Sequence, residues 1–411
     1  MRLAAVALAL LLDIAGPARA EAIVTIGTIF PLTGVSDKSG YDAMAAIEVA
    51  ANIVGTPHKG LETLPLGAGQ GLPNLGNASL AVIFTYHQGN PSVAVSQALR
   101  LIEQNHVVAL FGGGDGPTTL AATAEADRHG TPFLVPDAMA PEITGRGFKW
   151  VFRTTPFAGD MIDAYLRFLT ELKAAGTKID RIAVVSANDA RGAELARRLG
   201  EAAQTAGFAV DTIGYKPDGI DVTAAVTLLR QKNPDVAIFA CDAAGASLFI
   251  KTMKTLDYRP PILIGDDDGF SNPAFVNADG NLAQGLIDRS VWSAGEPGSP
   301  TTIVNGLFKA KTGHDLDDAS ARVVQGFLVL AEAINRAGST KPAAIQKALR
   351  ETDLKPDQLI VGYNGVKFDA SGQNTLASTY LTQLSGKQYV TVWPAARAAA
   401  KLVLPYKAWQ Q

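Results

Sequence analysis

Two turns rich in glycine and proline supply the groups in this sequence that are best suited to binding a small molecule. Residues 30–34 and 111–119 each follow a short apolar segment and lead into a helical pattern. Such a turn places backbone N–H groups at the edge of a cleft, where the start of the helix carries partial positive charge. Asp115 lies inside the second turn, and the sequence leaves open whether it contacts a ligand or caps the following helix.

Motifs for nucleophilic or metal-assisted catalysis are absent from the sequence. It contains no G-x-x-x-x-G-K-[ST] phosphate loop, no H-E-x-x-H or paired C-x-x-C metal motif and no G-x-S-x-G turn. The five histidines form no spaced pair, and we assign each a surface or turn position. We therefore expect no metal, no cofactor and a binding protein rather than an enzyme, although acid–base enzymes can lack such motifs.

Short apolar segments alternate with helical patterns along most of the chain. The segments show little period-two alternation, which is typical of parallel strands buried on both faces; they are residues 23–29, 80–85, 107–111, 133–135, 182–185, 236–240 and 262–264. This repetition predicts an α/β fold with helices on both faces of parallel sheets. A division after residues 150–154 separates two such series, and residues 362–393 change to short strands and turns.

Composition and charge narrow the class of protein further. The chain has 411 residues, of which 47% are apolar and 18% charged, so it can bury a core and suggests about two domains. Its net charge of −3 does not favour nucleic acid or an anionic membrane as a partner. The single cysteine, Cys241, cannot form an internal disulfide, and its apolar neighbours predict a buried position.

The first twenty residues have the pattern of a secretory signal peptide. Arg2 precedes an apolar run over residues 3–12, and Ala18-Arg19-Ala20 fits the small-x-small cleavage rule. The run is too short to span a membrane, which takes about 20 apolar residues. We expect cleavage after Ala20 and a periplasmic mature protein.

An ordered set of motifs gives the sequence a family resemblance. The set comprises Phe30-Pro31-Leu32-Thr33-Gly34, Gly112-Gly113-Gly114-Asp115-Gly116, residues 132–138, and a T-x-R-G-[FY] stretch at 144–148 followed by Phe152-Arg153-Thr154. Behind a signal peptide, it resembles the periplasmic solute-binding proteins of ABC importers, specifically the leucine/isoleucine/valine-binding type. The resemblance implies two doubly wound parallel-sheet lobes joined by three crossovers, with a ligand in the cleft between them.

The resemblance also implies where the lobes divide. It places the crossovers near residues 154–156, 288–291 and 360–363. The expected N-lobe is then residues 21–154 plus 289–360, and the expected C-lobe is residues 155–288 plus 361–411. Lobe closure about the crossovers would bury the ligand.

On the N-lobe, the family's ligand-binding positions fall on unusual residues. Gly116 matches a serine that grips the ligand's carboxylate, so the backbone amides of residues 116–119 or the hydroxyls of Thr118 or Thr119 would have to replace it. Asp137 and Met139 match a small residue and a threonine that meet the amino-acid backbone. Met139 cannot donate a hydrogen bond, and Asp137 would repel a carboxylate, which argues against an ordinary α-amino acid in the usual pose.

On the C-lobe, Arg191 and Asp242 match positions where the family places aromatic residues. The acidic residue that binds the ligand's ammonium matches Asp267, with Asp266 and Asp268 as alternatives. Tyr41, Tyr86 and Trp292 are candidate cleft aromatics, for which core packing is the alternative.

The resemblance therefore predicts a cleft rich in carboxylates. Asp115, Asp137, Asp242 and Asp267 would be offset only by Arg191, and carboxylates dehydrated together repel one another. A cationic ligand, a metal ion or a polyhydroxylated ligand would relieve the repulsion. The alternative is that some of these aspartates cap helices or form turns at the rim.

We interpret the sequence as the substrate-binding component of an ABC importer. It would capture a small polar solute (an amino acid, an amide or a related compound, with cationic and polyhydroxylated solutes among the candidates) and deliver it to a permease in the inner membrane. The resemblance implies a monomer without nucleic-acid partners. A periplasmic ligand sensor coupled to a regulator is the alternative, and an exported enzyme with paired aspartates is a third reading.

Overall fold

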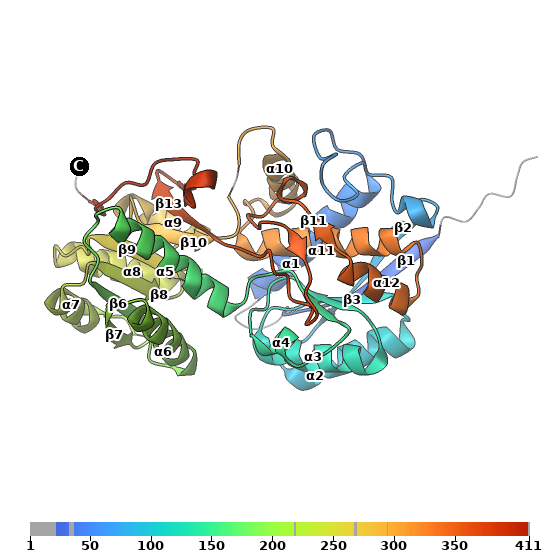
Figure 1. Cartoon of the computed structure of the whole chain (residues 1–411), viewed down its shortest axis with the longest axis horizontal. Coiled ribbons are helices and arrows are strands. Elements are labelled where there is room, and N and C mark those ends of the chain that lie inside the picture. Colours follow the sequence, from blue (N-terminus) through green and yellow to red (C-terminus); the bar gives the residue numbers. More distant parts are fainter. Residues whose placement is uncertain (1–21, 33–36, 218, 267–268, 294, 410–411) are drawn as a thin grey trace, which may run out of the picture.

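The computed structural model describes residues 22–409 except 33–36, 218, 267–268 and 294, and it forms two α/β lobes side by side (Figure 1). The sheet of the first lobe has the order β2-β1-β3-β4-β5 and is parallel throughout. Its strands are β1 (Ile23–Phe30), β2 (Ser79–Tyr86), β3 (Ala109–Gly112), β4 (Phe133–Val135) and β5 (Val151–Arg153). The helices that alternate with these strands along the chain are α1 (Asp37–Gly55), α2 (Pro91–Leu99), α3 (Gly116–His129) and α4 (Glu142–Gly145).

The second lobe contains a sheet of order β14-β13-β10-β9-β8-β6-β7. Strands β6 (Arg181–Ala187), β7 (Ala209–Tyr215), β8 (Val236–Ala240), β9 (Ile262–Asp266) and β10 (Ile287–Ser290) are mutually parallel. Strand β13 (Tyr380–Ser385) pairs antiparallel with β10, and β14 (Gln388–Trp393) pairs antiparallel with β13. The helices of this lobe are α5 (Ala158–Ala174), α6 (Ala190–Thr205), α7 (Thr223–Lys232), α8 (Ala243–Thr255) and α9 (Pro273–Asp279).

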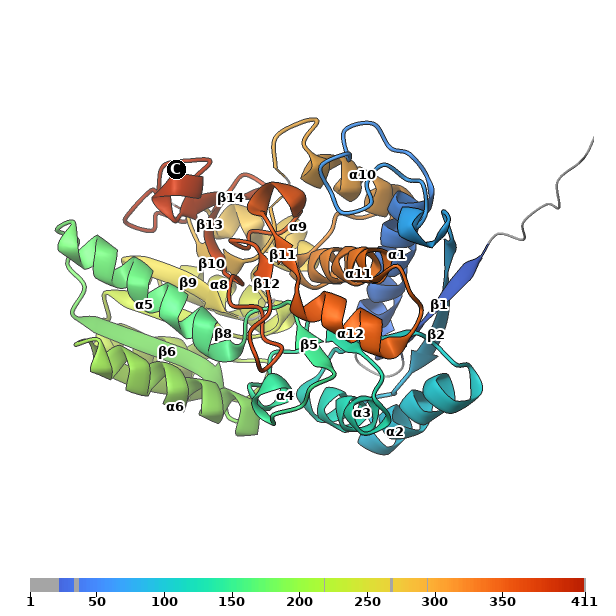
Figure 2. The same cartoon turned by 45° about the vertical axis from the view of Figure 1, so that its right-hand side comes forward.

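Helices α10 (Pro300–Thr312), α11 (Asp318–Ala337) and α12 (Pro342–Arg350) return the chain to the first lobe. Figure 2 shows α11 lying between α1 and α12, and the contacts among these helices agree. Asp317 caps α11 by accepting a hydrogen bond from the Ser320 N–H at 2.8 Å, and Gly338 ends it in the left-handed conformation. Helix α11 is buried along nearly its whole length, and the buried side chains include the polar Arg322 and Gln325 as well as apolar residues.

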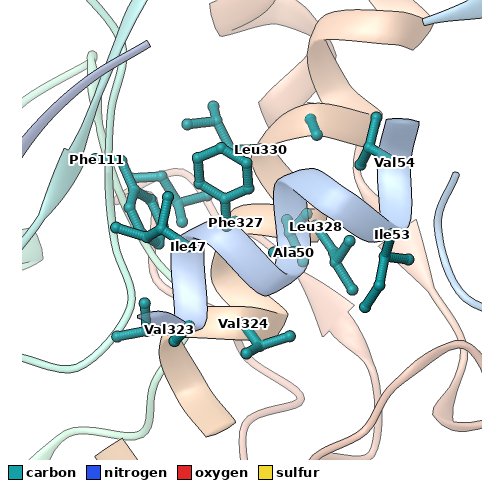
Figure 3. Close-up of a cluster of buried hydrophobic side chains, with 14 of the residues drawn as sticks. Ile47, Ala50, Ile53, Val54, Phe111, Val323, Val324, Phe327, Leu328 and Leu330 are labelled. Carbon is teal, nitrogen blue, oxygen red and sulfur yellow. The ribbon is translucent and has the colours of Figure 1, made fainter. Parts of the chain in front are cut away.

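The core of the first lobe lies where α1 and α11 pack against the sheet. Figure 3 shows Ile47, Ala50 and Ile53 of α1 facing Val324, Phe327 and Leu328 of α11, all of them buried. Gly326 of α11 is required by this close packing, because a Cβ there would lie 2.8 Å from the Cβ of Pro136. The helix is thereby held against the end of β4. The described helices include none that is long and apolar enough to cross a membrane.

The structure corrects two expectations about the chain. Residues 361–368, expected in the C-lobe, lie in the N-lobe, since Val361, Tyr363 and Phe368 pack in its core and Gln373 still pairs with Arg153 of β5. The chain therefore enters the second lobe only before β13, because these apolar side chains are buried against α11 and β5. Strand β7 was not predicted; it is an edge strand with several exposed positions, so it lacks the apolar run of a central strand.

Candidate functional site

The loops that follow β2, β3 and β4 contact one another at the carboxyl edge of the first sheet, where ligands of open α/β sheets bind. His87, directly after β2, is buried; its Nδ1 accepts a hydrogen bond from the Gly89 N–H at 3.0 Å. Nε2 must then carry the proton, and it donates to the Gly113 carbonyl at 3.1 Å. Burial lowers the pKa of His87, so the ring is neutral when it holds the loop after β3 through this hydrogen bond.

Asp137, directly after β4, holds the same loop from the other side. Its Oδ1 accepts a hydrogen bond from the Gly114 N–H at 3.1 Å. A Cβ on Gly113 would lie 2.3 Å from this oxygen, so only glycine allows the approach. Burial raises the pKa of Asp137, and the guanidinium of Arg322 on α11 opposes that rise.

Asp115 caps α3, which confirms the capping interpretation for this residue. Its carboxylate accepts hydrogen bonds from the Thr118 N–H at 2.9 Å and the Thr118 hydroxyl at 2.7 Å. The Thr119 hydroxyl donates to the Asp115 carbonyl at 2.6 Å, and both threonines are buried.

These contacts occupy several of the groups that the sequence offered for an anion site at the start of α3. The hydroxyls of Thr118 and Thr119 have already used their protons on Asp115. Pro117 has no N–H, the Thr118 N–H is taken by the cap, and the Thr119 N–H donates to the Asp115 carbonyl at 3.3 Å. Of the amides of residues 116–119, the Gly116 N–H is the one that these contacts do not occupy. The carboxylate of Asp115 therefore takes the place at the helix N-terminus that a ligand carboxylate would need.

Arg153, which follows the T-x-R-G-[FY] stretch, and Thr144 within the stretch build the wall of this site rather than its contact surface. Arg153 at the end of β5 is buried and donates to the Ala140 carbonyl at 2.6 Å and to Gln373 Oε1 at 2.7 Å. It also contacts Thr144 Oγ1 at 3.3 Å. Burial lowers the pKa of Arg153 to about 10. Arg153 thus fixes the loop that carries Asp137 and the half-buried Met139, and ties it to the returning chain.

The second lobe presents helix starts at the corresponding strand ends. Asp189 caps α6 and Asp242 caps α8, each through a hydrogen bond of 2.8 Å from the N–H three residues later. Asp242 thus has the capping role that the sequence left open. Arg191 lies in the first turn of α6, but its side chain lies outside the described part of the structure. Asp267, the expected ammonium ligand, and Asp268 also lie outside the described residues.

The structure therefore gathers six predicted residues, Asp115, Gly116, Thr118, Thr119, Asp137 and Met139, at one edge of the first lobe. Among the predicted aromatics, Tyr86 donates to Met44 Sδ at 3.1 Å, Trp292 packs against the first core and Tyr41 is exposed. A groove of about 810 Å³ opens beside β6, α6 and β7, and one of about 300 Å³ lies at the end of β7. Within the described chain, no three His, Cys, Asp or Glu residues gather to hold a metal.

Two arginines missed from the sequence change the expected charge balance. Arg322 of α11 offsets Asp137, and Arg289 of β10 lies 3.4 Å from Asp266, so Arg191 is not the sole counter-charge. Asp266 also accepts a hydrogen bond from the Tyr165 hydroxyl at 2.7 Å, and all three residues are buried. The available signal was a charged residue within a buried segment: Arg322 precedes Val323 and Val324 in α11, and Arg289 lies in a central strand.

Comparisons with known proteins agree with this architecture. The chain is similar to the Leu/Ile/Val-binding protein homolog 8 of Brucella abortus (strain 2308), with 27% identity over 402 residues covering 93% of each chain. Its fold matches the branched-chain amino acid transporter substrate binding protein LivJ from Streptococcus pneumoniae in complex with isoleucine (TM-score 0.70, 18% identity, 93% and 100% of the two chains). It also matches a solute binding protein of an ABC transporter from Rhodopseudomonas palustris BisB5 in complex with 3,4-dihydroxy benzoic acid (TM-score 0.70, 18% identity, 94% and 98%).

A family model described as periplasmic binding protein matches residues 23–388, which span both lobes and the segments between them. The chain therefore belongs to the periplasmic binding protein family, whose members bind solutes and are not enzymes.

Proposed function

We propose that the chain is the substrate-binding component of an ABC importer that captures a small polar solute bearing a cationic or hydrogen-bond-donating group. The observation that carries this proposal is the Asp115 side chain at the N-terminus of α3, where the resemblance would place a ligand's carboxylate. The described N-lobe loops add the carboxylate of Asp137, which Arg322 offsets. The neutral His87 adds no positive charge, and Arg322 is shared with Asp318 at 3.3 Å, so carboxylates outnumber cations here and the balance favours neutral or cationic solutes over anionic ones.

A thermal-shift and calorimetry screen tests the proposal. The panel contains leucine, amides, polyamines, urea, 3,4-dihydroxybenzoic acid and other aromatic acids. A solute present at 100 times its Kd stabilises the protein by about 2.7 kcal/mol, which moves the melting transition measurably. We expect amides, urea or polyamines to stabilise the protein and leucine and the aromatic acids to have no effect. Tight binding of leucine would overturn the argument from Asp115, Asp137 and Met139.

Variants connect the bound solute to the site. Asp137→Asn removes a carboxylate from the site and is expected to weaken binding of a cationic solute, whereas Asp357→Asn changes an exposed carboxylate and serves as the control. Since burial raises the pKa of Asp137, affinity for a cation should rise with pH as this carboxyl ionises. Equal affinities for both variants would separate Asp137 from the ligand.

We also propose export and cleavage after Ala20, with an ABC permease of the inner membrane as the partner of a monomeric binding protein. These N-terminal residues lie outside the described part of the structure. The family membership and the basic, apolar and small-residue pattern of the sequence support the proposal. N-terminal sequencing of the protein from the periplasm should give Glu21 as the first residue, and an intact Met1 would contradict export.

A further inference from the structure

A row of alternating charges runs from the first lobe to the second along the connection between them. In order, ion pairs join Arg322, Asp318, Arg289 and Asp266, and the charge of Arg322 also acts on Asp137 by opposing the rise of its pKa. Arg322 Nη1 lies 3.3 Å from Asp318 Oδ2, Arg289 Nη1 lies 4.0 Å from the same oxygen, and Arg289 Nε lies 3.4 Å from Asp266 Oδ1. Both arginines are buried, so these attractions are weakly screened by solvent and salt.

Asp318 is the centre of the row and also holds the crossover that leaves β10. Its Oδ1 accepts hydrogen bonds from the Val291 N–H at 2.9 Å and the Trp292 N–H at 3.3 Å, and the Ser290 hydroxyl contacts the same oxygen. Asp318 is the first residue of α11, a helix packed in the core of the first lobe. One carboxylate therefore joins the packed core helix of the first lobe to the chain that enters this lobe from the second.

Each arginine reaches a strand end that borders a predicted binding position. Arg289 contacts Asp266, the last residue of β9 and the neighbour of Asp267, while the Tyr165 hydroxyl holds Asp266 from the other side. Arg322 attracts Asp137, which grips the loop after β3. The carboxylates of the two lobes are thus connected through two guanidiniums that share Asp318.

We propose that Asp318 is a positioning residue that sets the arrangement of the two lobes and couples it to the charge at the candidate site. This inference rests on the proposed function only in that lobe arrangement would matter for solute capture; the contacts of Asp318 themselves involve no ligand. A change of charge at Asp137 alters how strongly Arg322 is drawn to Asp318. A change in that attraction changes how strongly the Asp318 carboxylate holds Arg289 and residues 290–292. In this proposal, residues 290–292 are a point about which the lobes turn.

The preceding residue shows that the start of α11 does not need Asp318 as a cap. Asp317 provides the cap, through Ser320, and its side chain has no part in the row described above. Two adjacent aspartates therefore have different roles, and the chain contains its own control. Asparagine at position 317 preserves a cap, since Asn and Asp are similar in that position. Asparagine at position 318 keeps an oxygen for the crossover amides but removes the charge that the arginines share.

The test measures the distance between the lobes by pulsed electron spin resonance. Spin labels are placed on cysteines introduced at Lys59 of the first lobe and Lys178 of the second, both of which are exposed. Cys241 is buried and stays in place, and labelling of the parent chain checks that it is silent. Distance distributions are recorded for the parent, Asp318→Asn, Asp317→Asn and Asp318→Glu without any solute added.

We expect Asp318→Asn to broaden the distribution and move it to longer distances, because Arg289 and Arg322 then lack a shared counter-charge. The ratio of lobe arrangements should change by about tenfold, the factor that one hydrogen bond to a charged group supplies. Asp317→Asn should match the parent, and Asp318→Glu should return part of the way to it. Equal distributions for the two asparagine variants, whether both changed or both unchanged, would overturn the inference.

If Asp318→Asn does not fold, as judged by circular dichroism, Arg322→Gln takes its place. It removes the cation between Asp137 and Asp318 and should also broaden the distribution; an unchanged distribution would overturn the inference. The measurement is independent of the solute screen, so a screen without hits would contradict the importer proposal and leave this one standing. Conversely, a bound solute with unchanged distributions would contradict only the role of Asp318.

Discussion

Replacement of Arg153 by methionine should destabilise the first lobe strongly, although the residue lies away from the surface of the site. Arg153 is 1% exposed, and its two shortest hydrogen bonds, of 2.6 and 2.7 Å, go to the Ala140 carbonyl and to Gln373 Oε1. Methionine fills much of the same space but leaves both acceptors without this donor. The Ala140 carbonyl keeps its bond from the Ile143 N–H and Gln373 Oε1 keeps its bond from the Thr144 hydroxyl, so what is lost is the pair of bonds to the charged donor. A hydrogen bond to a charged group contributes about 1.5–3 kcal/mol, so the pair predicts a loss of about 4 kcal/mol.

Urea unfolding followed by circular dichroism measures this loss. With an m-value of about 3 kcal/mol per molar urea, the midpoint should fall by about 1 M. Arg128→Met is the matched control, because the Arg128 side chain is 65% exposed and a surface change of this kind costs at most about 0.5 kcal/mol. Hydrogen exchange should accelerate at residues 138–146 and 372–374, the segments that Arg153 joins. A midpoint equal to that of Arg128→Met would refute the reasoning.

Three further predictions concern the helix starts, the packing and the buried histidine. Gly326→Ala should destabilise the protein by about 1–3 kcal/mol, because the added Cβ meets Pro136. Gly306→Ala, in open space on α10, should instead stabilise it by up to about 1 kcal/mol. Thermal melts that show the same sign of change for both variants would contradict the packing argument. Asp115→Ala should lose about 1 kcal/mol from the α3 cap and Asp115→Asn much less, as read from melting temperatures, and equal losses would argue against the cap. The folded-state pKa of His87 lies below its ordinary 6.5, so the unfolded chain binds more protons and stability falls as the pH drops below 6.5. His87→Gln should flatten this dependence of stability on pH in thermal melts between pH 5 and 7. A slope identical to that of the wild type would show that His87 is not its source.

The prediction of the site from the sequence succeeded where a residue acts on its own neighbours. Asp115 and Asp242 each cap the helix that follows them by accepting a hydrogen bond from the N–H three residues later, a relation that the local sequence contains. The use of Thr118 and Thr119 for a ligand stays a prediction: in the structure their hydroxyls donate to Asp115, and Pro117 lacks an N–H, as the sequence already showed. Arg289 was missed because its partner Asp266 lies 23 residues away on another strand. Arg322 has an ion-pair partner four residues away, at Asp318, but its proximity to Asp137 depends on another element of the fold.

The sequence by itself determined the α/β alternation, the helix ends and the N-lobe strand ends at which candidate residues gather. Those features follow from hydrophobic periodicity and from capping, which act over a few residues. Only the tertiary structure decided that residues 361–368 stay in the first lobe, that β7 is an edge strand and that Asp318 joins two buried arginines. Each of these depends on which distant segments become neighbours when apolar surface is buried, and a linear pattern does not contain that information.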